Sequence, residues 1–102
     1  MKQIINGKMY NTETAKEVGE YWNGLGWSDF NYCDELLYKK KTGEFFLYGE
    51  GGPNTKYGKS IGNNSYSGGQ RIIPLTDDEA RSWCEKHLNA DEYIEVFGEP
   101  EE

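Results

Sequence analysis

Histidine and cysteine are scarce in this sequence of 102 residues, which contains one histidine and two cysteines. Cys33 and Cys84 stand far apart without paired spacing, so both are predicted to be reduced packing residues, in preference to a disulfide or a metal site. Cys84 and His87 lie one helical turn apart, but a metal site would need two further ligands. The single histidine also removes the commonest general base. We therefore expect no metal, no cofactor and no catalytic residue.

Long apolar runs are also missing. No segment approaches the roughly 20 consecutive apolar residues that a membrane-spanning helix needs. The N-terminus becomes polar directly after Ile5, where a signal peptide would continue as an apolar run. These features predict a cytoplasmic protein.

Apolar residues make up only 35% of the chain, but aromatic residues make up 15%. Each buried aromatic ring removes a large area from water, so this composition predicts a folded chain and not a disordered one. A chain of this length has room for one modest core. We expect a single domain over residues 1–98, followed by a frayed acidic tail over residues 99–102.

The net charge of −7 is unevenly distributed. Residues 77–102 contain ten acidic and two basic residues and carry −8, which leaves +1 for residues 1–76. The acidic end should repel a nucleic-acid backbone, or imitate one in a basic groove of a partner. The side chains expected to form this acidic surface are Asp91, Glu92 and Glu95.

Signals for a hairpin and a helix open the chain. Asn6-Gly7 favours the positive φ angles of a type I′ turn between two short strands. Thr14 and Glu17 have the spacing of a capping box, and an apolar stripe at helical spacing begins beside them. The spacing predicts a helix over residues 13–22.

The rest of the chain reads as strands followed by helices. Apolar residues predict a second hairpin from strands 35–40 and 44–48 and a further strand over 70–73. Capping signals and apolar stripes predict helices over 77–88 and 90–97. The expected fold class is α+β: a small antiparallel sheet of two hairpins plus a fifth strand, packed by an N-terminal helix and two C-terminal helices.

Residues 49–69 are rich in glycine and form a connection far longer than the usual 4–6 residues, which is typical of a functional or disordered loop. Spaced tyrosines on adaptable backbone are suited to contact with a protein partner. The loop and the neighbouring aromatic strand face are therefore predicted to form a partner-binding surface. Its expected residues are Phe46, Tyr48, Asn54, Lys56, Tyr57, Lys59 and Tyr66.

Two catalytic interpretations of the sequence fail on their geometry. Gly58-Lys59-Ser60 follows a strand as in a phosphate-binding loop, but Pro53 occupies a position that needs glycine and no helix follows Ser60. Asp34 and Glu35 are adjacent carboxylates, but consecutive residues of a strand point to opposite faces. The protein is thus predicted not to be an enzyme.

A second interpretation is single-stranded nucleic-acid binding. Lys39–Lys41 and the loop lysines lie among tyrosines in the sequence, and cations interleaved with aromatic rings are the ingredients of surfaces on which bases stack. The acidic C-terminal segment opposes this affinity. Nucleic-acid binding is therefore the alternative and protein binding the first prediction.

Several stretches resemble a family of small accessory proteins from bacterial phages, plasmids and conjugative elements. They are Asn6-Gly7-Lys8, Thr12–Ala15, LYKKKTGEFFLYGEGGP, Lys56-Tyr57, SGGQRIIPL, EARSWCEKHL and DEYIEVFGEPEE. The resemblance spans most of the chain and implies a binding protein of a mobile element, with no assigned reaction. By analogy with other compact acidic proteins of such elements, it implies an inhibitor of host defence similar to anti-CRISPR proteins. The partner would be a bacterial protein or ribonucleoprotein complex.

Overall fold

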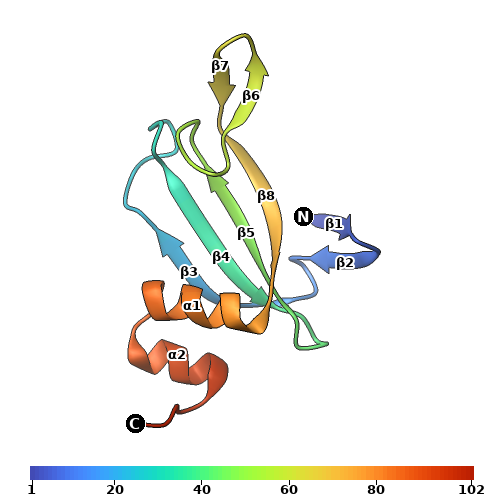
Figure 1. Ribbon diagram of the computed structural model, residues 1–102, viewed down its shortest axis with the longest axis vertical. Coiled ribbons are helices and arrows are strands. Elements are labelled where there is room, and N and C mark those ends of the chain that lie inside the picture. The colour runs from blue at the N-terminus through green and yellow to red at the C-terminus, as the bar shows by residue number, and fades with distance from the viewer.

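Four antiparallel strands form a central sheet in the computed structural model, which describes residues 1–102 (Figure 1). In spatial order they are β3 (Lys16–Trp22), β4 (Cys33–Lys39), β5 (Phe45–Gly51) and β8 (Gly69–Leu75). Two separate hairpins are formed by β1 (Lys2–Ile5) with β2 (Lys8–Asn11) and by β6 (Lys59–Gly62) with β7 (Ser65–Ser67). Helices α1 (Asp77–His87) and α2 (Ala90–Phe97) end the chain.

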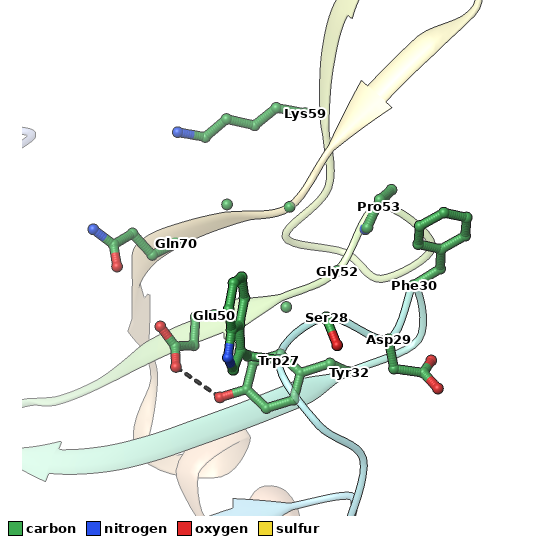
Figure 2. Close-up of a pocket in the computed structure, with 13 residues that line it drawn as sticks. Trp27, Ser28, Asp29, Phe30, Tyr32, Glu50, Gly52, Pro53, Lys59 and Gln70 are labelled. Carbon is green, nitrogen blue, oxygen red and sulfur yellow. Dashed lines mark hydrogen bonds between the residues drawn. The ribbon is translucent and has the colours of Figure 1, made fainter.

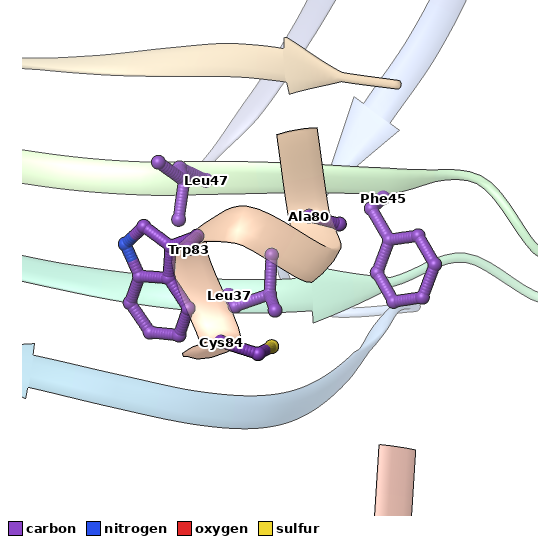
Figure 3. Close-up of a cluster of buried hydrophobic side chains, with 6 residues drawn as sticks. All are labelled: Leu37, Phe45, Leu47, Ala80, Trp83 and Cys84. Atoms are coloured by element: carbon purple, nitrogen blue, oxygen red, sulfur yellow. The ribbon is translucent and has the colours of Figure 1, made fainter. Parts of the chain in front are cut away.

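The central sheet separates two clusters of buried side chains. On one face, side chains of β4 and β5 pack against α1 (Figure 3), and the cluster consists of Leu37, Phe45, Leu47, Ala80, Trp83 and Cys84. On the other face, Tyr10 of the β1–β2 hairpin packs on Tyr38, Phe46 and Ile72. Full burial of a phenylalanine such as Phe46 contributes about 1.5–3 kcal/mol. The β1–β2 hairpin lies near the β4–β5 turn, where Lys8 pairs with Glu44, and farther from that turn Glu20, Trp22 and Gln70 on the same face are exposed.

Local sequence signals account for several of these elements. Asn6 and Gly7 have φ angles of 51° and 79°, as a type I′ turn requires, and the predicted first hairpin is confirmed. Thr76 and Glu79 form the reciprocal capping box of α1, with bonds of 3.1 and 2.9 Å. The two predicted C-terminal helices are present. The predicted second hairpin is present as β4 and β5.

The predicted helix over residues 13–22 is wrong, because residues 13–15 form a turn and residues 16–22 are strand β3. The Asn11 side chain accepts a hydrogen bond from the Glu13 backbone NH at 3.0 Å, so the polar residues form a turn and do not begin a helix. A glycine within the strand then allows α1 to pack closely, since a Cβ on Gly19 would lie 3.1 Å from the Trp83 ring. The α+β prediction with three helices is thereby corrected: the protein is mostly β, with 42% of its residues in strands and 19% in helices.

The segment 49–69 is also more regular than predicted. Strand β5 continues to Gly51, residues 59–67 form the β6–β7 hairpin, and β8 begins at Gly69. Strand β8 continues through Pro74, which an edge strand tolerates because one side of its backbone makes no ladder hydrogen bonds. Only residues 52–58 remain as an irregular loop.

Both cysteines are free thiols, with Cys84 buried in the α1 cluster and Cys33 half-buried. Burial raises the pKa of the Cys84 thiol to about 11. Neither α1 nor α2 has the length and apolar character that crossing a membrane requires.

Candidate functional site

A cleft of about 690 Å³ lies at the end of the sheet where β5 ends and β8 begins. We call it the loop cleft. Figure 2 shows Trp27, Tyr32 and Glu50 along one side and Lys59 across from them, with Gln70 at one end. Glycine backbone forms much of the lining, from residues 51–52 and 68–69. A ligand can therefore approach the main chain closely here.

Backbone hydrogen bonds between two loops shape this cleft. The segment 23–32, which connects β3 to β4, contacts the loop 52–58 through Gly52 N to Tyr32 O (2.9 Å) and Asn54 N to Phe30 O (2.9 Å). A Cβ on Gly52 would lie 2.5 Å from the Phe30 carbonyl oxygen, so only glycine permits this approach. The two loops thus support one another at the mouth of the cleft.

A buried carboxylate fixes the loop 52–58 to the sheet and to α1. Glu35 is 3% exposed and accepts hydrogen bonds from the Tyr57 hydroxyl at 2.5 Å and from the Trp83 indole NH at 3.0 Å. The Lys56 ammonium pairs with the same carboxylate at 2.7 Å. The Tyr57 ring lies directly over Gly49, where an added Cβ would be 2.0 Å from the ring. We call Glu35, Lys56, Tyr57 and Trp83 the Glu35 cluster.

The Glu35 cluster shifts the pKa values of its members. Burial by itself would raise the pKa of Glu35, but hydrogen bonds from Lys56, Tyr57 and Trp83 outweigh it and leave the pKa lowered. The pKa of Tyr57 is raised, because burial disfavours the phenolate and the hydroxyl donates to Glu35. Both shifts favour an ionised Glu35 bound to a neutral Tyr57.

The uncovered part of the sheet opposite α1 carries several carboxylates and one tryptophan. Cross-strand pairing places Trp22, Asp34, Glu50 and Gln70 in one row across all four strands. Glu20 lies in the next row on the same face. We call this surface the open face, and its first row adjoins the loop cleft, since Glu50 and Gln70 belong to both.

Asp34 is surrounded by like charge on the open face. Burial and repulsion from the carboxylates of Glu20, Glu50 and Glu17 together raise the pKa of Asp34 to about 6. Its buried Oδ1 atom has no hydrogen-bond partner. The predicted alternation of Asp34 and Glu35 is confirmed, because Glu35 faces α1 and Asp34 faces away.

The residues predicted to bind a partner do not form one surface. Phe46 is fully buried in the core, and Tyr57, 2% exposed, belongs to the Glu35 cluster, so neither is available to a partner. Lys56 is engaged with Glu35, and the Tyr48 hydroxyl donates to Gln70 at 2.8 Å. The remaining residues are exposed: Asn54 in the loop, Lys59 at the loop cleft, and Tyr66 on the β6–β7 hairpin.

The two groups of lysines in the nucleic-acid interpretation lie at opposite ends of the sheet. Lys39–Lys41 lie at the β4–β5 turn, whereas Lys59 lies at the β6–β7 end (Figure 1). Lys40 is also occupied by Glu44 at 3.4 Å and by the Tyr10 ring at 4.1 Å. The fold therefore does not assemble the continuous cationic and aromatic track on which this alternative depended.

Three exposed aromatic residues of the site were missed by the sequence reasoning. Trp22, Trp27 and Phe30 are 56%, 84% and 66% exposed. Trp27 and Phe30 belong to a stretch that mixes aromatic and polar residues without a helix or strand period, and this lack of period was the available signal. The Trp22 indole NH donates to the Leu25 carbonyl at 2.8 Å, which holds this exposed ring in place.

The predicted acidic surface on α2 consists of exposed side chains. Asp91, Glu92 and Glu95 all face solvent, and Glu92 also caps α2 by accepting from the Asn89 backbone NH at 3.0 Å. This surface belongs to the helical side of the molecule, on α2.

The fold and the site define a small β-rich protein with one helix-covered sheet face and one open, acidic and aromatic face. Comparison with protein-family models, with curated proteins and with solved structures finds no match to this chain.

Proposed function

We propose that this protein is a non-catalytic binding module that contacts another protein through the loop cleft and the adjoining open face. The observation that carries this proposal is the exposure of Trp27 and Phe30 in one cleft, together with the exposure of Trp22 on the adjoining open face. Tryptophan is enriched among the residues that dominate binding energy at interfaces. Gathered exposed apolar side chains on a soluble chain mark interaction sites more often than isolated ones do.

The arrangement of the buried polar groups supports a binding role over a catalytic one. Glu35 is the most buried carboxylate, and both of its oxygens are bonded to donors of the same chain. Burial, along with repulsion from Glu35, raises the pKa of the Cys33 thiol, which lowers its nucleophilic fraction at neutral pH. The Glu35 cluster instead keeps the cleft in a fixed shape, which reduces the entropy lost on binding.

The wider biological setting rests on the sequence resemblance. A cytoplasmic protein of a bacterial mobile element that inhibits host defence stays a prediction, and a bacterial protein or ribonucleoprotein complex is the corresponding partner. The binding proposal does not depend on this setting, because it follows from the exposed side chains alone.

The test is differential capture from a bacterial lysate with immobilised protein. The site variant is Trp27→Ala with Phe30→Ala, because both side chains are exposed and their removal leaves the core intact. The matched control is Ile94→Ala, which truncates an exposed apolar side chain on α2. Circular dichroism and thermal unfolding establish that all three proteins are folded.

We expect a protein that the wild type and the Ile94→Ala control retain and that the double variant loses. A reduction of at least about tenfold in the captured amount corresponds to about 1.4 kcal/mol, a modest loss for two interface aromatics. Equal capture by the wild type and the double variant would overturn the proposal, and so would capture of nothing above a blank resin.

A further inference from the structure

We infer that the segment docking on the open face is cationic, a peptide with arginine or lysine side chains that lie along the carboxylate row and reach into the loop cleft. This inference rests on the proposed function and specifies the chemistry of its partner. It is carried by the placement of charge on the open face and by the exposed indoles beside it.

The carboxylates of the open face oppose one another directly. Asp34 pairs with Glu50 across β4 and β5, and like charges in directly opposite positions destabilise a sheet. Glu20 lies in the next row of the same face on the neighbouring strand β3, and its charge adds to the repulsion on Asp34. Repulsion among these carboxylates lowers the stability of the free protein, and a cation placed over the face would reduce that repulsion.

No cation of the chain itself relieves this repulsion. The three ion pairs of the protein are Lys8–Glu44, Lys40–Glu44 and Lys56–Glu35, and none involves the open face. Glu20 is exposed and Glu50 half-buried on this face, and neither has a cationic partner within the chain. Their carboxylates are the complement of a guanidinium or ammonium group.

The loop cleft offers further contacts for a cationic side chain. The Tyr32 hydroxyl donates to Glu50 Oε1 at 2.7 Å, which orients this carboxylate at the cleft and leaves its other oxygen available. Trp27, 84% exposed in the same cleft, offers an indole face to a cation (Figure 2). Lys59 lies on the far side of the cleft from both. A cationic side chain entering beside Trp27 and Glu50 would thus meet a carboxylate and an aromatic ring together.

Other occupants fit less well. An acidic segment would add repulsion to a face that already carries it, and a purely apolar segment would bury ionised carboxylates without compensation. A metal ion is disfavoured because no three histidine, cysteine, aspartate or glutamate side chains lie close enough to hold one. Charge complementarity therefore selects a cationic peptide.

The test measures binding of a fluorescein-labelled peptide with five Arg-Gly repeats by anisotropy, beside a Glu-Gly peptide of the same length. The row variant is Glu20→Gln, Asp34→Asn and Glu50→Gln. The control variant is Glu85→Gln, Glu99→Gln and Glu101→Gln, which removes the same charge from exposed positions on the helical side and the C-terminal end. Comparison of the two separates the open face from the net charge.

We expect the wild type and the control to bind the Arg-Gly peptide with affinities within about threefold, and the row variant to bind at least about tenfold more weakly, since three ion pairs of moderate strength are removed. The Trp27→Ala variant should also weaken binding. The Glu-Gly peptide should not bind.

Equal weakening in the row and control variants would overturn the inference, because it would assign binding to net charge. Absence of Arg-Gly binding at millimolar protein would overturn it too. If lysate capture still depends on Trp27 and Phe30 in that case, the cationic inference fails and the binding module stands. If lysate capture is also independent of them, the proposed function fails with it.

Discussion

Asp34 and Glu35 are consecutive carboxylic acids in β4 whose pKa values are shifted in opposite directions. Strand alternation places Glu35 among three donors on the α1 side and places Asp34 among carboxylates on the open face. The alternation itself could be predicted from the sequence. The identity of the surroundings could not, because the donors to Glu35 come from residues 56, 57 and 83 and depend on the tertiary fold.

Replacement of Glu35 should destabilise the protein at neutral pH. Glu35→Gln removes the charge that Lys56 and Tyr57 bind, and the expected loss is about 2–3 kcal/mol in the free energy of unfolding, measured with urea at pH 7. Because the pKa of Glu35 is lowered in the folded state, its contribution is present above the unfolded value of 4.5 and disappears as the pH falls through the folded value. The difference between wild type and variant should therefore shrink toward pH 3. A loss that is independent of pH would contradict an electrostatic role.

Replacement of Asp34 should have the opposite effect. Asp34→Asn imitates the protonated side chain, so it should stabilise the protein by about 1 kcal/mol at pH 7, less than the full pKa shift would give because solvent screens a partly exposed group. With a folded pKa of about 6 against 3.8, the cost of ionised Asp34 is complete above pH 6 and is removed as the pH falls between these values. The stabilisation should vanish near pH 4. Glu85→Gln, an exposed change on α1, should alter stability by less than about 0.5 kcal/mol at either pH.

At the scale of elements, the attachment of the loop 52–58 to β5 depends on a missing side chain. Gly49 leaves the space that the Tyr57 ring fills, since an added Cβ would be 2.0 Å from ring atoms. We expect Gly49→Ala to displace Tyr57 from Glu35 and to lower the free energy of unfolding by about 3 kcal/mol or more, because overpacking and a broken buried hydrogen bond act together.

The matched control for this prediction is Gly26→Ala. Its added Cβ would have no atom within 4 Å, so stability should change by less than about 0.5 kcal/mol. Urea unfolding measures the stability of both variants, and the NMR signals of the Tyr57 ring report whether this ring has moved. If Gly49→Ala unfolds at the same urea concentration as the wild type, Tyr57 does not depend on this contact.

The elements that were predicted correctly are those whose signals are local. The Asn6-Gly7 turn and the capping box at Thr76 each specify backbone conformation within four residues. The segment 13–22 carried equally local helix signals, yet pairing with β4 and the contact of Gly19 with α1 determine its structure. Tertiary contacts outweigh propensity in such a short segment. The glycines of residues 49–69 likewise allow neighbouring segments to approach the backbone closely. From the sequence alone, the same glycines predict a loop.

At the scale of the whole molecule, the distribution of charge in space differs from that along the chain. Residues 1–76 are almost neutral in total, but the fold separates their charges. Acids of β3, β4 and β5 gather on the open face, while Lys39–Lys41 lie at the opposite end of the sheet. The register across three strands creates this separation of charge. Summing the charges of successive segments of the sequence could not predict it. Of the residues predicted to bind a partner, only Lys59 lines the loop cleft, and the carboxylate row was not predicted.

The carboxylate row predicts how salt affects the stability of the whole protein. At about 10 mM salt charges interact over about 30 Å, whereas at about 150 mM the range falls to about 8 Å. Repulsion within the open face should therefore make the free energy of urea unfolding rise by about 1 kcal/mol between these concentrations. The Glu20→Gln, Asp34→Asn, Glu50→Gln variant should lose at least half of this rise. The variant with Glu85, Glu99 and Glu101 replaced by glutamine has the same net charge and should keep most of it, because those carboxylates do not face one another across a sheet. Equal salt dependence in the two variants would contradict the prediction, since the repulsion would then belong to the total charge and not to the row that β3, β4 and β5 bring together.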